Sequence, residues 1–238
     1  MDLCKRFYYD RHQAQSLRKW FIHKVLRKAA PKPPQTFSIE NLTLAVNHGE
    51  SVGIVGGNGS GKSTLLRVLA GIYRPTSGRM ECSSKLAAVL ELGAGFHKEL
   101  TGADNIATYA AAMGLSRTEL RDRWAEIVAF ADIGEVLEKP IKHYSTGMQA
   151  RLALSVALCG TFDTLLVDEV LSVGDQNFRR KVESRLKEFH AEGGTLVLVS
   201  HDFRHIRALC TRTIWLQNGR IVADGDTHAV LRSYEEAA

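Results

Sequence analysis

The stretch Gly56-Gly57-Asn58-Gly59-Ser60-Gly61-Lys62-Ser63 decides how this chain folds. It has the spacing G-x-x-x-x-G-K-[ST], it follows the apolar run at residues 51–55, and a helix is predicted from Lys62 to about Leu69. Glycines let the backbone N–H groups of such a loop converge on a chain of phosphates, and the helix N-terminus adds partial positive charge. An ordinary glycine-rich turn is the alternative, but the order of strand, loop and helix favours a phosphate-binding loop.

Two side chains of this loop and two acids further along the chain have complementary chemistry. The Lys62 ammonium can reach the β- and γ-phosphates of a nucleotide, and the Ser63 hydroxyl can bind Mg²⁺. The apolar run at residues 164–167 ends in Asp168 and Glu169. Asp168 can hold the Mg²⁺ shell, and Glu169, on the other side of the strand, can polarise a water molecule toward the γ-phosphate. Strands on ordinary surfaces also end in acids, and the phosphate loop is what favours the functional interpretation.

The segment Tyr144-Ser145-Thr146-Gly147-Met148-Gln149 stands before a helix that is predicted at residues 150–158. Ser145 is the predicted N-cap of that helix, and the small residues after it leave backbone N–H groups open for an anion. On these grounds alone the segment is only a capped helix. Its position in the sequence, between the phosphate loop and the Asp168–Glu169 strand, is what favours a functional interpretation of the segment.

Composition and charge limit the class of protein. The chain has 238 residues, of which 45% are hydrophobic and 24% are charged, so disorder, collagen and coiled coil are excluded. Its uncharged stretches are shorter than the roughly 18 residues that a membrane span needs, and the N-terminus has no apolar signal region. We therefore expect a cytoplasmic chain, whose scattered cysteines are reduced thiols.

The positive charge of the chain is concentrated in one segment. Seven cations and no acid lie between Arg11 and Ile39. The charge of this segment therefore exceeds the net charge of +5 of the whole chain, and the rest of the chain is nearly neutral. Residues 14–28 are predicted to form a basic amphipathic helix that ends at the prolines of residues 30–34. A single basic segment does not indicate nucleic-acid binding across a whole face, and we expect no nucleic-acid partner.

Strand and helix patterns alternate along the rest of the chain, which predicts a mostly parallel sheet with an antiparallel addition near each end. The sequence Asn218-Gly219 between two apolar runs is a strong hairpin signal. Further strands are predicted at residues 37–46, 164–167 and 195–200, and further helices at 104–138 and 179–190.

Taken in order, these motifs resemble those of one family. The phosphate loop, the Ser145–Met148 signature, the Asp168–Glu169 strand and the run Val199-Ser200-His201 are similar to the nucleotide-binding subunit of an ABC transporter. Three segments narrow the resemblance to exporters of O-antigen, capsule or teichoic acid: residues 90–102, 144–148 and 168–175.

The resemblance implies an α/β fold. A P-loop NTPase (RecA-like) core with a mostly parallel sheet and antiparallel β additions is expected at about residues 36–90 and 160–228, with a helical signature subdomain at 100–158. The whole chain, 1–238, is then a single ABC nucleotide-binding domain in which residues 11–34 are a basic helical insert. Some O-antigen exporters append a carbohydrate-binding domain after the cassette. We expect none here, because the sequence ends about ten residues after the last family-like element at His228, and independent folding needs at least about 40 residues.

The resemblance also implies an ATPase that powers the export of a polysaccharide or glycolipid across the inner membrane. ATP and Mg²⁺ are the implied cofactors, and two copies sandwich two ATP molecules head to tail, so a homodimer is expected. The other expected partner is an integral membrane permease subunit, which places the chain at the cytoplasmic face of the inner membrane. An anionic membrane surface is an expected contact of the basic segment.

Individual residues receive roles from the same resemblance. Glu169 and His201 are the implied catalytic residues, and Ser63 and Asp168 are the implied metal ligands. The resemblance also implies an early aromatic that stacks on adenine, for which Phe7 is the best-placed candidate and Tyr8 and Tyr9 are the alternatives. The other implied nucleotide contacts lie in the phosphate loop and the signature: Gly56, Gly57, Asn58, Gly59, Ser60, Gly61, Lys62, Ser63, Thr64, Ser145, Thr146, Gly147 and Met148.

The sequence departs from the family pattern at three places. Thr146 stands where the usual signature has glycine, Gly174 precedes Asp175, and residues 90–102 lack the usual glutamine, for which Glu91 is the nearest polar substitute. Two alternatives remain at this point. A soluble ABC-type ATPase that acts on ribosomes or DNA typically has tandem cassettes or a coiled-coil insertion, which this chain lacks. A regulatory module that switches without turnover is disfavoured by the intact Asp168–Glu169 pair.

Overall fold

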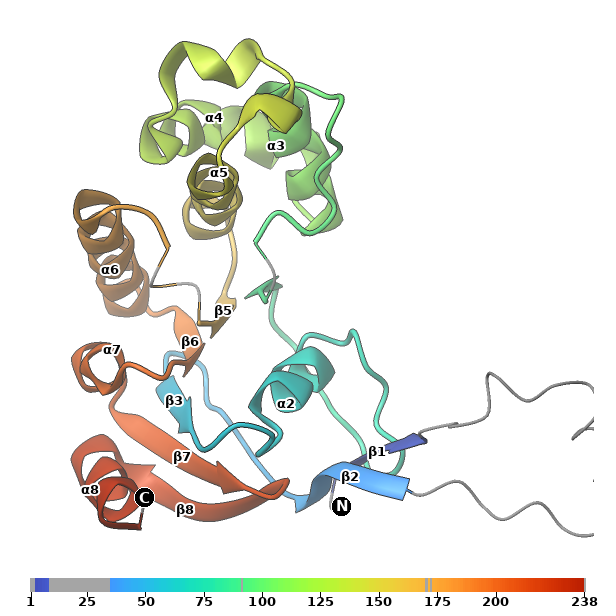
Figure 1. The fold of residues 1–238 in the computed structure, drawn as a ribbon, viewed down its shortest axis with the longest axis vertical. Coiled ribbons are helices and arrows are strands. Elements are labelled where there is room, and N and C mark those ends of the chain that lie inside the picture. Colours follow the sequence, from blue (N-terminus) through green and yellow to red (C-terminus); the bar gives the residue numbers. More distant parts are fainter. Residues whose placement is uncertain (1–2, 9–34, 91, 170, 172, 238) are drawn as a thin grey trace, which may run out of the picture.

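Parallel strands form the centre of the molecule, with their order in the sheet being β4-β5-β6-β3-β7-β8 (Figure 1). The computed structural model describes residues 3–8, 35–90, 92–169, 171 and 173–237, without the side chains of 6–8 and 35–37. The first five strands in this order are parallel, and β8 is antiparallel to β7. Their bounds are β3 Ser51–Val55, β4 Leu86–Val89, β5 Thr164–Asp168, β6 Thr195–Val199, β7 Arg212–Gln217 and β8 Arg220–Asp226.

The strands alternate their side chains between two buried layers. On β5, Leu166 belongs to one hydrophobic cluster, whereas Leu165 and Val167 belong to the other, as the two-residue period of a strand requires. The helix α2, Lys62–Leu69, packs on the Leu166 side. The helix α6, Gln176–Ala191, covers the opposite face. Both faces of the central strands β3, β5 and β6 are therefore buried, which explains why these three strands are mainly apolar.

An antiparallel pair lies beside α2 as a separate two-stranded sheet. It consists of β1, Leu3–Tyr8, and β2, Gln35–Leu42. The strand predicted at residues 37–46 was wrong at its end. Asn41 has a φ of 47°, and Leu42 already pairs with Leu3, so no described residue of β1 remains for residues 43–46 to pair with. The basic helix predicted at residues 14–28 lies outside the described residues.

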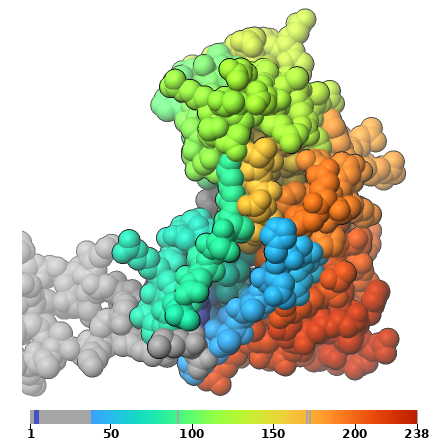
Figure 2. All heavy atoms as spheres, turned by 180° about the vertical axis from the view of Figure 1, so that it is seen from behind, coloured from blue at the N-terminus to red at the C-terminus, as the bar shows by residue number. Residues whose placement is uncertain are grey.

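Helices form a separate layer at one end of the sheet, and this layer stands out as a lobe in the space-filling view (Figure 2). Three α-helices, with short 3-10 turns before the last of them, build this layer. Capping boxes at Thr101 and Ser116 begin the first two, because each hydroxyl accepts a bond from the backbone N–H three residues later. The bounds are α3 Gly102–Ala112, α4 Arg117–Ala131 and α5 Thr146–Cys159.

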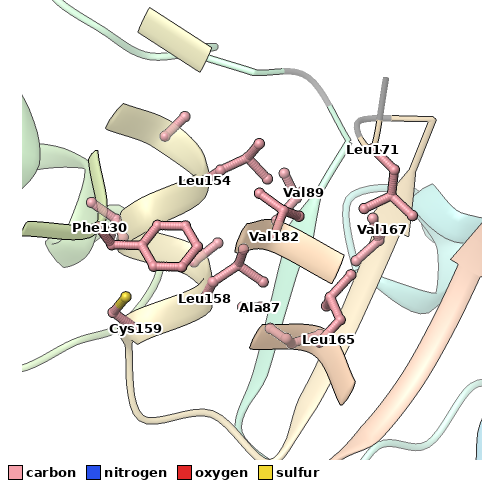
Figure 3. Packing of buried hydrophobic residues seen from close by; sticks show 14 of the residues in the cluster. Ala87, Val89, Phe130, Leu154, Leu158, Cys159, Leu165, Val167, Leu171 and Val182 are labelled. Carbon is pink, nitrogen blue, oxygen red and sulfur yellow. The ribbon is translucent and has the colours of Figure 1, made fainter. Parts of the chain in front are cut away.

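The helix α5 joins this layer to the sheet. Its Leu154 and Leu158 face Val182 of α6 and the side chains of β4 and β5 (Figure 3). The sequence predicted this helix from residue 150, but it begins one turn earlier, because Ser145 caps it and the signature residues form its first turn. The helix also packs closely on α4 and on α6, so the signature is attached to the main hydrophobic core.

The C-terminal part of the chain completes the face that α6 covers. The helix α7, Phe203–Leu209, follows β6, and α8, Thr227–Ala237, follows β8. The hairpin between β7 and β8 turns at Asn218 (φ 49°) and Gly219 (φ 75°), as the sequence predicted. None of the described helices combines the length and the apolar character that crossing a bilayer would require.

Candidate functional site

The phosphate loop lies between β3 and α2, enclosed by two other strands. Gly56 has a φ of 150° and Gly61 a φ of 109°, and residues that carry a side chain rarely adopt such backbone angles. A Cβ atom at Gly56 would overlap the carbonyl oxygen of Leu216 in β7, and one at Gly61 would overlap the carbonyl oxygen of Ser38 in β2. The glycine spacing is therefore required by the close approach of neighbouring backbone as well as by the loop itself.

Lys62 is held inside this loop. Its Nζ donates to the carbonyl oxygens of Gly56 at 2.8 Å and Gly57 at 3.0 Å, and the residue is only 6% exposed. Burial lowers the pKa of Lys62, while the charges of Glu169 and Asp168 oppose that shift. The ammonium thus lies where phosphate oxygens can replace two backbone carbonyls as its partners.

Asp168 ends β5 close to the first turn of α2. The Ser63 side chain hydrogen-bonds to the carboxyl group of Asp168, but burial outweighs this contact and raises the pKa of Asp168. Its Oδ1 atom is buried and has no hydrogen-bond partner among the described residues. A hydroxyl beside a buried carboxylate oxygen that lacks a donor is a donor set that suits Mg²⁺, which binds through one or two carboxylates and substrate phosphates.

Glu169 and His201 form the second pair of the site. Their Oε1 and Nε2 atoms are 2.9 Å apart, and the two side chains are 49% and 54% exposed. Glu169 has a φ of 53°, and its N–H donates to the carbonyl oxygen of Val199 at 3.0 Å. Because β5 and β6 are adjacent and parallel, both residues follow the carboxyl ends of neighbouring strands, where α/β sheets bind ligands.

The signature residues lie in the helical layer. The Ser145 hydroxyl accepts a hydrogen bond from the N–H of Met148 at 3.2 Å and so caps α5, as predicted. Ser145 and Thr146 are exposed, and Gly147 is partly exposed. Within the described residues, no hydrogen bond or ion pair joins the signature to the phosphate loop of the same chain, so one chain does not bring the two motifs together.

Two other predicted contacts are placed only in part. The backbone of Phe7 pairs with Thr36 in the β1–β2 sheet, but its side chain lies outside the described residues. Thr64 lies in the first turn of α2 and is partly buried. Glu91, the predicted substitute for glutamine, lies outside the described residues.

A cleft of about 260 Å³ beside the phosphate loop was not predicted. Asn58 and Ser60 of the loop line it, together with Trp215, Asn218 and Tyr234. The Asn218-Gly219 turn signal placed the end of β7, but no motif predicted that Tyr234 of α8 would reach the loop.

A glycine loop at the start of a helix, a buried acid beside it and a Glu–His pair at adjacent strand ends define a P-loop nucleotide-binding protein. The chain belongs to the ABC transporter family, which residues 39–172 match.

The names of several curated relatives specify polysaccharide export. The chain is 35% identical to the O-antigen export system ATP-binding protein RfbB of Klebsiella pneumoniae, over 99% of this chain and 96% of that protein. It is 40% identical to RfbB of Myxococcus xanthus over 84% of this chain. It is 38% identical to the teichoic acids export ATP-binding protein TagH of Levilactobacillus brevis over 98% of this chain. The chain spans 46% of the Myxococcus protein and 63% of the Levilactobacillus protein.

The fold is that of known cassettes. The ATP-binding cassette MJ0796, in a dimeric post-hydrolysis state bound to ADP and Pi, matches with a TM-score of 0.73 at 22% identity, over 95% of this chain and 97% of that one. The α/β architecture with a helical layer is therefore shared with an ABC cassette.

Proposed function

We propose that the chain binds and hydrolyses ATP with Mg²⁺ and thereby powers the export of a polysaccharide or glycolipid. The observation that supports hydrolysis most directly is the 2.9 Å contact between Glu169 and His201, next to Lys62 and Asp168. A module that only bound nucleotide would need the phosphate loop but not a carboxylate held by an imidazole beside it.

Each residue of the site has a role in this proposal. Lys62 binds the β- and γ-phosphates, and Ser63 and Asp168 hold Mg²⁺, which neutralises phosphate charge when bound. Glu169 orients a water molecule whose oxygen attacks the γ-phosphorus, so the bond to the bridging oxygen breaks and ADP leaves. His201 keeps the carboxylate of Glu169 in place and contacts the γ-phosphate.

The exposed signature supports a head-to-tail homodimer. Ser145–Met148 begin α5 and leave its N-terminus open to an anion, yet they do not contact the loop of their own chain. In the proposed dimer, Ser145, Thr146 and Gly147 close over the ATP that the partner binds, and Phe7 stacks on the adenine of its own ATP. Two copies then complete two sites.

The relatives support export as the work that hydrolysis performs. Their names specify O-antigen and teichoic acid export. The proposed partner is an integral membrane permease subunit, which places the chain at the cytoplasmic face of the inner membrane. The proposed class of substrate is the O-antigen or teichoic acid chain.

Replacing Glu169 with glutamine tests the catalytic assignment. Glu169→Gln keeps the shape of the site and removes the carboxylate charge, so ATP binding is retained and most turnover is lost. Because hydrolysis can no longer separate the copies, size-exclusion chromatography with ATP should show a stable dimer. A variant that stays monomeric with ATP, or that hydrolyses ATP at the wild-type rate, contradicts the proposal.

Export is tested in cells that depend on this chain for a surface glycan. Loss of the chain should remove the glycan from the surface and leave it inside the cell. Wild-type protein should restore export, whereas Lys62→Ala should not, and a membrane protein should co-purify with both. Normal surface glycan in the absence of the chain contradicts export as the function.

A further inference from the structure

One residue of the turn between β7 and β8 bridges the phosphate loop and β2. The N–H of Gly219 donates to the carbonyl oxygen of Ser60 in the loop at 2.8 Å, and the carbonyl oxygen of Gly219 accepts a hydrogen bond from the N–H of Glu40 in β2 at 2.9 Å. The tip of the hairpin reaches the β1–β2 sheet at this point (Figure 1). In the part of the chain that the structure describes, no other backbone hydrogen bond joins β2 to the strands of the main sheet or to the turns between them.

The contact leaves no room for a side chain at Gly219. This residue is buried and has a φ of 75°. A Cβ atom on Gly219 would lie 2.9 Å from the carbonyl oxygen of Ser38 and 3.0 Å from the Cα atom of Ile39, both of which are backbone atoms of β2. The same carbonyl oxygen of Ser38 faces Gly61 of the phosphate loop. One point of β2 is therefore in close contact with both the turn and the loop.

Side chains support this contact on both sides of the turn. The Nη2 atom of Arg220 is 3.0 Å from Oε1 of Glu40, and these side chains are 63% and 30% exposed. Ile39 of β2 and Leu216 of β7 are fully buried in one hydrophobic cluster. The exposed ion pair contributes little by itself, whereas the close packing makes β2 follow any shift of the turn.

A nucleotide has to contact the loop and the β1–β2 sheet at the same time. Its phosphates bind where α2 begins, and its adenine is proposed to stack on Phe7, whose backbone belongs to β1 and pairs with Thr36 of β2. The covalent structure of the nucleotide limits the distance between base and phosphates, so both contacts form without strain only at one spacing of sheet and loop. A displaced β1–β2 sheet would lose the base and leave the phosphate contacts in place.

We propose that Gly219 is a positioning residue that sets the spacing between the phosphate loop and the base-binding β1–β2 sheet. This inference rests on the proposed function, in which Lys62 binds the phosphates and Phe7 stacks on the adenine of the same nucleotide. Gly219 touches neither part of the nucleotide. It acts through Ser60 on one side and through Glu40 on the other, and so determines how strongly a whole nucleotide is preferred over its phosphates alone.

ADP and pyrophosphate separate the two contacts, because both carry two phosphates and only ADP carries a base. Titration calorimetry with Mg²⁺ measures both dissociation constants on the purified full chain, without turnover. For the wild type we expect ADP to bind at least about tenfold more tightly than pyrophosphate, since stacking of a base on an aromatic side chain contributes on the order of tenfold in affinity.

Two substitutions displace β2 from the turn. Gly219→Ala places a methyl group against the carbonyl oxygen of Ser38, so ADP affinity should fall on the order of tenfold, while pyrophosphate affinity changes by less than about twofold. Arg220→Glu is milder, because this exposed residue then repels Glu40 instead of attracting it. It should lower the ratio of ADP affinity to pyrophosphate affinity by a smaller factor, and the folding of this variant is not in question.

Each substitution has a matched control. Gly71, which follows α2, has a φ of 73°, and a Cβ atom there would meet no described atom within 4 Å. Gly71→Ala therefore introduces the same backbone strain without a contact, and it should lower the melting temperature but keep the wild-type affinity ratio. Lys187→Glu reverses a charge on α6 that pairs with Glu183 at 2.7 Å, and it should also keep the ratio.

The outcomes distinguish the inference from the proposed function. A wild-type chain that binds neither ADP nor pyrophosphate contradicts the proposed function, and equal affinity for the two overturns the base contact and the inference with it. If the wild type prefers ADP and a folded Gly219→Ala variant keeps that preference, the inference alone fails. If Gly219→Ala does not fold, an unchanged ratio in Arg220→Glu overturns the inference. It also fails if Gly71→Ala loses the preference to the same extent, because the effect would then reflect general destabilisation.

Discussion

Asp168 has two properties that make its protonation measurable. Its Oδ1 atom is buried without a partner among the described residues, and burial raises its pKa above the ordinary range for aspartate. A metal ion requires the ionised carboxylate, so a raised pKa means that the site loses Mg²⁺ affinity at a higher pH than an exposed aspartate would. The neutral form is favoured as the pH falls through this raised value.

We therefore predict that Mg²⁺-dependent ATP binding weakens as the pH falls from neutral. Asp168→Asn should bind Mg²⁺ at least about tenfold more weakly at neutral pH and should lose most of this pH dependence. Titration calorimetry with both proteins over a pH series provides the measurement. Since ATP itself also takes up protons as the pH falls, the difference between the two proteins isolates Asp168. Parallel pH profiles for both proteins would show that Asp168 is not a ligand.

At this scale, residues at strand ends could be predicted, and residues placed by helix packing could not. Lys62 and Asp168 lie at fixed offsets from apolar runs, and adjacent parallel strands bring such ends together. The contact of Glu169 with His201 follows from the same geometry. Arg151 of α5 gave no such signal, because its contact with Asp175 depends on how α5 packs on α6.

At the scale of elements, the carboxylate of Glu119 in the first turn of α4 binds residues that lie next to the strands of the sheet. Glu119 Oε1 lies 2.5 Å from the Nζ of Lys85, which precedes β4, and 2.7 Å from the hydroxyl of Thr161. Glu119 also accepts a hydrogen bond from the N–H of Ser116, closing the capping box. The hydrogen bond from Lys85 is the largest of the contacts that hold the pKa of Glu119 far below its usual value.

Glu119 should therefore contribute stability that depends on pH. A lowered pKa in the folded state means that the contribution is complete above the pKa of the unfolded chain and is lost as the pH falls toward the folded value. Glu119→Gln should lower the melting temperature at neutral pH and have less effect in acid. Glu183→Gln, which removes the exposed pair with Lys187, is the control and should have little effect at either pH. A difference from wild type that does not change with pH contradicts this account.

Element types could be predicted from the sequence better than element boundaries. Long periodic runs such as α4 and α6 were predicted, whereas β4, with four residues, and α7, with seven, are too short for periodicity to show. The extra turn of α5 was missed because Thr146 and Gly147 are poor helix formers that a cap holds in the helix. The end of β2 depended on which residues β1 could pair with.

For the whole molecule, the basic segment at residues 11–34 bears on where the protein works. We propose that it contacts anionic headgroups near the permease. Each nearby lysine or arginine adds about 1 kcal/mol of attraction to an anionic leaflet, and only some of the seven cations can face it. Replacing Arg18, Lys19, Arg27 and Lys28 with glutamate should reduce binding to anionic liposomes and export. ATPase activity in solution should stay near normal.

Neutral liposomes and a salt series serve as controls for this prediction. The wild-type protein should bind anionic liposomes more strongly at low salt, where charges are less screened, and should bind neutral ones weakly at any salt. Unchanged liposome binding and unchanged export in the glutamate variant would leave the segment as a solvated surface helix.

The central claim is that each ATP site is built from two chains, and mixing two inactive variants tests it most directly. Lys62→Ala removes the phosphate ligand from its own site, and Ser145→Arg places bulk and charge against the site of the partner. A mixed dimer retains one intact site, with Lys62 from one chain and Ser145 from the other. Random mixing at equal amounts leaves at most about a quarter of all sites intact. We predict that each variant alone is inactive and that the mixture recovers ATPase activity up to about that level. No recovery, when mixed dimers are shown to form, would contradict the claim and place each site within a single chain.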